Sequence, residues 1–496
     1  MCDKLNFAIE LFVPKKHIKI NNKPPRFNYR LCNLKNIKNK ALKKYKSSNL
    51  SEDKLVFEKL RREFDFLHNF LYKQYIFNIE SSLRENPKSF WNYIKSKRKT
   101  NGFPTNMEFQ NNYSCNTEES CNLFARFFQT VYENNDHNEI FDFDDLNDTF
   151  LKNFVITEKN VVDAINNLQS SYNIELDNFP KILFKKCSIY LVPPLTKLFN
   201  LCMQYGDFLD CWKVCHIVPI FKSGNRNSVE NYRGIVKQGL FAKVFDNIVK
   251  NLLFDHLKNV ISPKQHGFYP GRSTASNLSI ISNKILNCME ARKQFDVIYT
   301  DFSKAFDKVD HRLLMQKLIK CNLTSNVLNF FFNYITNRKL FVKIDSVLSS
   351  IEVNAFSGIP QGTHCGPILF LLFINDLPNV FINCDCLLFA DDVKIFLEIK
   401  SFSDCLKLQN DFERLFVWCE TNKLYLNFKK CSVMSFSRIT NPINFSYNVN
   451  NSILQRNNEI KDLGVIFDVK MTFQSHYNAI INKSYAMLGF IKRNSA

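Results

Sequence analysis

Residues 295–307 read FDVIYTDFSKAFD, and residues 386–397 read CLLFADDVKIFL. In the first stretch an apolar strand pattern runs into Asp301; in the second, two apolar segments flank Asp391 and Asp392. Adjacent acids between apolar strands fit a tight hairpin turn, although such a turn also fits a solvated loop. Like charges held close together are costly unless a cation neutralises them. Because carboxylate oxygens suit Mg²⁺, the two stretches together predict a sheet whose strand ends bind metal.

A third stretch, SGIPQGT at residues 357–363, is followed by Gly366-Pro367 and an apolar helical segment. Its two glycines let the backbone approach a ligand closely, and Gln361 adds an amide donor and acceptor. Each stretch alone is a weak signal. Their order is more specific: the glutamine follows Asp301 by about 60 residues and precedes Asp391 by about 30.

The composition of the 496-residue chain excludes several classes of protein. With 49 Phe and 18 Tyr the chain can build a sizeable core, and with only 12 Gly it is not collagen-like. The longest apolar run, residues 368–374, is too short to span a membrane, and the N-terminus lacks the apolar core of a secretory signal. The 16 Cys therefore indicate reduced, mostly buried thiols. A zinc site at Cys211, Cys215 and His216 is less favoured than simple packing.

Positive charge is concentrated at the N-terminus. Residues 1–100 hold 24 Lys and Arg against 9 Asp and Glu, whereas residues 101–200 hold 7 against 14, in a chain of net charge +19. A basic region of this kind suits a nucleic acid or is simply a solvated tail. We expect a loosely ordered arm over residues 1–50, a helix from Ser51, and an acidic, Asn-rich linker over 101–150. The later pattern predicts an α+β fold, with strands at 214–221 and 295–300 and helices at 181–205, 237–257 and 366–380.

The same stretches resemble a known family. DFSKAFDKVDH, GIPQGTHCGPILFLLFINDL and FADD resemble motifs A, B and C of the palm of reverse transcriptases. WKVCHIVPIFKSGN, NYRGI and QHGFYPGRST resemble the finger segments of the non-LTR (LINE-like) group, LNFKKCSVMSFSR resembles motif D, and IKDLGVIFD resembles the closing strand motif. NPKSFWNYIKSKR resembles the stretch before the polymerase in jockey-type elements.

The resemblance implies a right-hand polymerase. A basic, mostly helical extension would span residues 1–100, the linker 101–150, the fingers 151–290, the palm 291–440, and the closing strand motif with the start of a thumb 441–496. No segment matches the upstream endonuclease that such elements usually carry. We therefore expect endonuclease activity to come from another chain or to be absent, and the thumb to be partial.

The resemblance also assigns the metal site. It implies that two Mg²⁺ ions, or Mn²⁺ as an alternative, are bound by Asp301, Asp391 and Asp392, with the backbone carbonyl of Phe302 as a further ligand. Phe306, five residues after Asp301, matches the steric gate that excludes a 2′-hydroxyl; its alternative role is a core aromatic residue.

Further residues match the substrate and proton-transfer positions of the family. Lys222 and Arg233 match the residues that hold the triphosphate, and Gln361 and Gly362 those that border the nucleotide and template. Three assignments leave alternatives open. Arg272 contacts the template or the triphosphate, or it lies at the surface. Lys430 is the expected proton donor to pyrophosphate, with Lys429 as the alternative, and Asp307 and Asp310 are expected to cap the next helix rather than to bind metal. Gly234 departs from the family, which usually has proline there.

The resemblance implies an RNA-directed DNA polymerase that extends a primer DNA with dNTPs on a template RNA, acts in the nucleus after cytoplasmic synthesis, and needs no membrane. Two rival functions remain. One is an inactive or co-opted copy that binds RNA without polymerising, which the altered finger segment and partial thumb favour. The other is a two-metal nuclease or phosphatase, for which the GIPQG loop and Phe306 would have no evident purpose.

Overall fold

The computed structural model describes residues 2–13, 27–97, 103–104, 106–133, 154–170, 176–177, 179–450 and 452–495. The chain divides into two compact units. The core unit comprises Met1–Asn6 and Phe103–Ala479, and the helical unit comprises Phe7–Gly102 and Ile480–Ala496. The helix α1 (Cys2–Phe12) and the C-terminal helix α16 (Gln474–Ser495) each run from one unit into the other. No helix in these described ranges is both long and apolar enough to cross a membrane.

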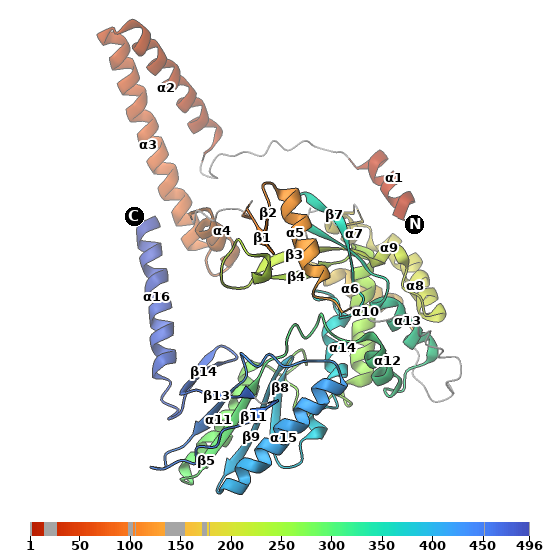
Figure 1. Cartoon of the computed structure of the whole chain (residues 1–496). Coiled ribbons are helices and arrows are strands. Elements are labelled where there is room, and N and C mark those ends of the chain that lie inside the picture. Colours follow the sequence, from red (N-terminus) through yellow and green to blue (C-terminus); the bar gives the residue numbers. More distant parts are fainter. Residues whose placement is uncertain are drawn as a thin grey trace. The chain divides into compact units, whose positions relative to one another are not determined.

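The helical unit is built on a pair of long helices, α2 (Tyr29–Ser48) and α3 (Ser51–Ser81), which lie side by side in Figure 1. A third helix, α4 (Pro87–Lys97), packs on the end of α3 through a small cluster of Ile79, Tyr93 and Ile94. The expected start at Ser51 is confirmed. The expected loose arm is wrong for residues 2–12 and 29–48, which form α1 and α2. The Asn28 side chain caps α2 by accepting from the Leu31 amide at 2.9 Å.

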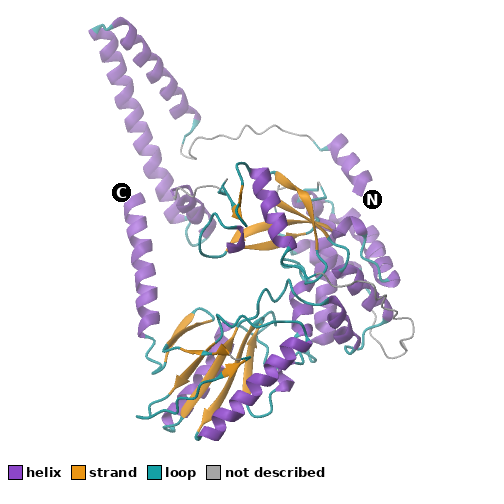
Figure 2. Ribbon diagram, in the orientation of Figure 1, coloured by secondary structure: helices purple, strands orange, loops and turns teal. Residues whose placement is uncertain are grey.

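A five-stranded sheet in the core unit carries the acidic stretches (Figure 2). Its strand order is β13 (Gln455–Arg456), β10 (Ser432–Phe436), β5 (Gln294–Thr300), β9 (Asp392–Ile399) and β8 (Asp385–Phe389). All neighbours are antiparallel except β10 and β13. Every residue of β5 is buried, as expected for a central strand. Helix α11 (Thr274–Glu290) covers one face with Ile281, Ile285 and Met289, and α15 (Phe402–Thr421) packs on β9.

The core unit also contains a four-stranded sheet, in the order β4 (Tyr232–Lys237), β3 (Val214–Phe221), β6 (Lys339–Ile344) and β7 (Val347–Asn354). Helix α5 (Thr117–Gln129) packs on it with Phe124 and Phe128 in a core that also contains Ile217. The predicted linker is therefore wrong for residues 106–133, whose phenylalanines are buried in this core despite the Asn-rich composition. Residues 134–150 of that segment, with the acidic run, lie outside the described residues.

Helices and short strands complete the core unit. The helices are α6 (Glu158–Asn166), α7 (Lys181–Lys186), α8 (Ser188–Tyr205), α9 (Asp210–Lys213), η2 (Val229–Asn231), α10 (Leu240–Leu257), α12 (His311–Ile319), α13 (Ser325–Ile335), α14 (Cys365–Phe373) and η3 (Leu377–Val380). The small hairpins are β1 (Glu108–Phe109) with β2 (Asn112–Tyr113), β11 (Asn448–Val449) with β12 (Ser452–Ile453), and β14 (Glu459–Asp462) with β15 (Val465–Asp468).

Three predicted helices have different limits in the structure. The segment 181–205 is divided at Cys187, and residue 237 ends β4 rather than starting α10. The apolar segment 366–380 stops at Phe373 and resumes as the short helix η3, with Pro378 in its first turn. A proline lacks the amide that a continuous α-helix would need at this position. The predicted strand at 214–221 matches β3 at both ends.

Candidate catalytic site

The β8–β9 hairpin holds Asp391 and Asp392 at its turn. Phe389 pairs with Asp392, so Ala390 and Asp391 form a two-residue connection, and Asp392 is the first residue of β9. On the other side of β9, Val393 pairs with Thr300, the last residue of β5. Asp301 follows Thr300 directly, and the antiparallel register therefore places it beside Asp392 on the neighbouring strand. The sheet thus brings together three acids that are separated by about 90 residues in the sequence.

The electrostatics of these acids fit a site that binds cations. Burial raises the pKa of Asp391, and the nearby charge of Asp301 raises it further. Burial raises the pKa of Asp392 to about 6, together with the charges of Asp391, Asp301 and Asp462. Bound cations would relieve this repulsion. No three acidic, His or Cys side chains in the described parts of the chain already converge as a metal cage. Carboxylates suit Mg²⁺, which is commonly held by one or two of them together with substrate phosphates and water.

Lys430 lies against the first acid. Its ammonium forms an ion pair with Asp301 Oδ2. The segment before it pairs with the chain around Asp301: the Asn427 amide donates to the Asp301 carbonyl at 2.7 Å, and Phe302 is bridged to Leu426. The Phe302 ring is buried next to Trp418. This local pairing brings Lys430, and not Lys429, to the acid.

The GIPQG loop docks on the segment that follows Asp301. The Ile359 amide donates to the Phe306 carbonyl at 2.7 Å, and Gln361 Nε2 donates to Asp307 Oδ1 at 3.1 Å. On its other side the loop joins β4, where the Val236 amide donates to the Gln361 carbonyl at 2.7 Å. Gly362 at φ +106° fits this junction because an added Cβ would lie 2.7 Å from the Val236 carbonyl oxygen.

Asp307 and Asp310 differ in their environments. Asp310 caps α12 by accepting from the Leu313 amide at 3.0 Å, as expected, and pairs with Lys423 at 2.7 Å. Asp307 does not cap the helix, so that part of the expectation is wrong. It lies in the turn before the cap, where burial raises its pKa to about 6 while Lys304 and Arg233 oppose the rise.

The Phe306 ring is half-buried between other aromatic side chains. It is stacked on Phe370 of α14 with a centroid distance of 4.4 Å and meets the edge of Phe268 at 6.0 Å. The ring is therefore held in place by α14, at a position five residues after Asp301. Both the gate and the packing role expected for it are compatible with this placement.

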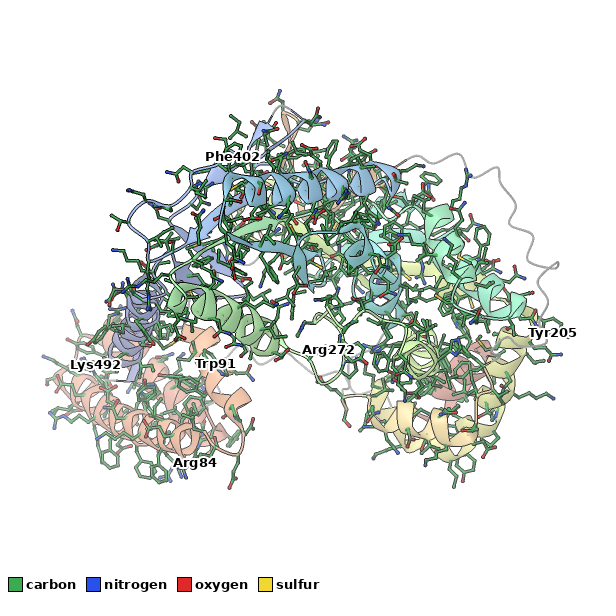
Figure 3. All side chains as sticks on the ribbon, turned by 90° about the horizontal axis from the view of Figure 1, so that it is seen from below. Arg84, Trp91, Tyr205, Arg272, Phe402 and Lys492 are labelled. Atoms are coloured by element: carbon green, nitrogen blue, oxygen red, sulfur yellow. The ribbon has the colours of Figure 1, made fainter. Side chains whose placement is uncertain are left out.

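The predicted basic residues divide into two groups. Lys222 and Arg233 lie at the paired ends of β3 and β4, are exposed, and are close enough to Asp391 for their charges to lower its pKa. Arg272 lies on the loop between α10 and α11 (Figure 3). Its guanidinium donates to the carbonyls of Ser262 at 3.1 Å and Gln265 at 2.5 Å and lies over the Tyr269 ring at 3.9 Å.

Asp246 and Lys394 are buried polar residues that support this region and were not predicted from the sequence. Asp246, within the apolar helix α10, accepts from the His364 and Cys365 amides at 2.5 and 3.1 Å and so caps α14. Lys394, within the apolar strand β9, forms an ion pair with Asp462 at 2.6 Å, and both side chains are almost completely buried. Each was detectable as a single charged residue inside an apolar pattern, which implies a buried partner without identifying it.

A family model and several known proteins are similar to this chain. The family model described as "Reverse transcriptase (RNA-dependent DNA polymerase)" matches residues 220–467. The chain is 26% identical over 342 residues to the probable RNA-directed DNA polymerase from transposon BS of Drosophila melanogaster, covering 66% of this chain and 38% of the relative. It is 27% identical over 297 residues to the RNA-directed DNA polymerase from the mobile element jockey of the same species, covering 58% and 32%.

The chain thus spans about a third of the length of these curated relatives. Among solved structures, that of apo telomerase from Candida tropicalis, truncated from its C-terminal domain, is similar over 62% of either chain. The TM-score is 0.36 and the identity 11%, values too low to establish a shared fold.

Proposed function

Because the chain belongs to the reverse transcriptase family, we propose that it is an RNA-directed DNA polymerase of the non-LTR group. It would extend a primer 3′-hydroxyl with dNTPs on an RNA template. The observation that carries the proposal is the register of β5, β9 and β8. It places Asp301 next to the Asp391–Asp392 turn, as two-metal phosphoryl transfer requires.

Asp301, Asp391 and Asp392, with the carbonyl of Phe302, would hold two Mg²⁺ ions, for which Mn²⁺ is an alternative. When bound, these ions would lower the pKa of the primer hydroxyl and neutralise charge on the leaving pyrophosphate. Lys430 would release Asp301 and donate a proton to pyrophosphate. Its exposed ammonium and its contact with Asp301 support this role.

The remaining residues would bind the nucleotide. Lys222 and Arg233 would hold the triphosphate, since their charges already reach Asp391. Gln361 and Gly362 would form the wall of the pocket, and Phe306, fixed by Phe370, would exclude a 2′-hydroxyl. A contact of Arg272 with template or triphosphate would use the guanidinium face that does not lie on Tyr269.

In this proposal the fingers span residues 151–290 and the palm spans residues 291–440, which contain β5, β8, β9 and β10 of the five-stranded sheet. Residues 441–496 hold the closing strand motif and the start of the thumb. The basic helical unit would bind template RNA through its phosphates, so that binding weakens steeply with salt. We further propose that the protein acts in the nucleus, where a primer 3′-hydroxyl on DNA is available.

The second candidate function is an RNA-binding protein that does not polymerise. The altered finger segment favours it, because Gly234 stands where the family usually has proline. Primer extension on poly(rA) with oligo(dT), dTTP and Mg²⁺ distinguishes the two functions. Extension by the wild type, reduced by about 10³-fold or more in Asp391→Asn, supports the polymerase. RNA binding without extension by either chain supports the binding protein.

A further inference from the structure

The turn that carries the acids has an unfavourable backbone conformation. Ala390, which directly precedes Asp391, has φ +54°. Residues with a Cβ rarely adopt this left-handed region, and turns that require it usually have glycine or asparagine. The surrounding structure must therefore hold Ala390 in place. Any relaxation at this residue would move the backbone of Asp391 directly.

A buried glutamine makes that contact. Gln265 is only 3% exposed, and its Oε1 accepts from the Ala390 amide at 2.9 Å and from the Gly267 amide at 2.7 Å. Its Nε2 lies 3.5 Å from the Ala390 carbonyl. One side-chain amide thus contacts both backbone polar groups of the strained residue.

The segment around Gln265 is itself fixed to the hairpin. The His266 amide donates to the Leu388 carbonyl at 2.9 Å, and the Leu388 amide donates to the Lys264 carbonyl at 3.0 Å. Gly267 lies so close that an added Cβ would be 2.2 Å from the Ala390 nitrogen. The segment therefore follows β8 like a short additional strand and ends against the turn.

Arg272 contacts the backbone of the same glutamine. Its guanidinium donates to the Gln265 carbonyl and to the Ser262 carbonyl, closing the loop that carries Gln265. A continuous series of contacts leads from Arg272 through Gln265 to Ala390, one residue from the acid.

We propose that Gln265 is a positioning residue that holds the β8–β9 turn in the conformation at which Asp391 and Asp392 can share metal ions with Asp301, and that Arg272 acts through Gln265. This inference rests on the proposed polymerase function. It makes Gln265 a determinant of metal binding and of the chemical step, without contact to the substrate.

The test compares Gln265→Met with Gln409→Met in the full chain. Gln409 is a matched control because it is also buried and its amide similarly pairs with both backbone groups of Asn448, at 3.0 and 2.6 Å, in the remote strand β11. We measure kcat and KM for dTTP, the affinity for Mn²⁺ by electron paramagnetic resonance, and the melting temperature. Gln265→Met should lower kcat by roughly ten- to a hundredfold with KM within about twofold, because a small displacement of catalytic groups is costly.

The Mn²⁺ affinity should fall in Gln265→Met and not in Gln409→Met, while both variants lose similar thermal stability. Equal kcat and Mn²⁺ affinity in the two variants would overturn the inference. If the wild type itself does not extend a primer, the polymerase proposal fails, and Mn²⁺ affinity alone then decides whether Gln265 positions the acids.

Two further variants keep the test decisive if Gln265→Met does not fold. Arg272→Met should reproduce the loss of kcat and Mn²⁺ affinity more weakly; a rise in KM for dTTP alone would instead identify Arg272 as a substrate ligand. Ala390→Gly, which removes the cost of the left-handed conformation, should restore part of kcat when combined with Arg272→Met. If the double variant does not regain kcat, and if the Mn²⁺ affinity is the same in all variants, the proposal is wrong.

Discussion

The ammonium of Lys430 is paired with the carboxylate of Asp301, the residue that directly follows the central strand β5 of the five-stranded sheet. The same lysine thus neutralises an acid that metal ions would use. Metal binding and this ion pair compete for one carboxylate, and the released ammonium would be free to meet the leaving group.

Replacing Lys430 by methionine should separate these two effects. Mn²⁺ should bind a few-fold more tightly to the free protein because the competing ammonium is gone. The kcat for primer extension should nevertheless fall roughly a hundredfold, the usual contribution of a general acid. Lys429→Met is the control, and a loss of kcat in that variant instead would transfer the role to Lys429.

Metal binding should weaken in mild acid. The pKa of Asp392 is about 6 and that of Asp391 is also raised, so protons compete with metal below about pH 6. The Mg²⁺ concentration for half-maximal extension should therefore rise steeply below this pH and stay nearly constant from pH 7 to 8. A constant Mg²⁺ requirement down to pH 5.5 would contradict this prediction.

The raised pKa of Asp392 also determines in which direction the stability of the folded protein changes with pH. Between the ordinary carboxyl pKa of 3.8 and about 6, the folded metal-free protein binds more protons at Asp392 than the unfolded chain does, so its stability falls as pH rises through this window. Asp392→Asn should therefore raise the melting temperature at pH 7 without metal. Asp310→Asn should lower it, because the pKa of Asp310 is depressed by Lys423 and the helix amides.

Phe306 should control the choice of sugar. Replacing it by alanine removes the ring stacked on Phe370 and should increase incorporation of rNTP relative to dNTP by roughly tenfold or more. Phe306→Tyr keeps the bulk and should retain discrimination. If Phe306→Ala lowers only the melting temperature, the ring is a packing residue and not a gate.

Gly362 should be less replaceable than Gly271. Both have positive φ, so alanine should cost about 1–2 kcal/mol at either position from conformation alone. At Gly362 the added Cβ would also displace β4 from the GIPQG loop. At Gly271 no atom lies within 4 Å of the place that an added Cβ would occupy. Gly362→Ala should thus raise KM for dNTP in steady-state assays and lower the melting temperature further. Equal effects of the two changes would contradict the role of the junction.

Local pattern was sufficient for much of the fold. Alternating and continuous apolar runs identified β3 and β5, and the positions of Asp301, Asp391 and Asp392 at strand ends followed from those runs. The pattern failed for α2 and α5, whose polar composition resembles loops. Asn28 caps the first, and tertiary burial of Phe124 and Phe128 stabilises the second.

The supporting residues of the site could not be predicted because their partners are remote. Gln265 bonds to Ala390 and Asp246 to His364, both across more than 100 residues of chain. Nothing in the sequence near Gln265 or Asp246 specifies these contacts. A buried polar residue indicates that a partner exists, but only the folded chain identifies it.

The buried pair of Lys394 and Asp462 has a consequence for the order in which the protein folds during synthesis. Lys394 leaves the ribosome about 70 residues before Asp462, an interval of several seconds at roughly 5–20 residues per second. Until then β9 carries an ammonium that cannot be buried without its counter-ion, and β10 lacks its edge neighbour β13. We therefore expect the sheet that bears the acids to close only after the nascent chain has passed residue 462.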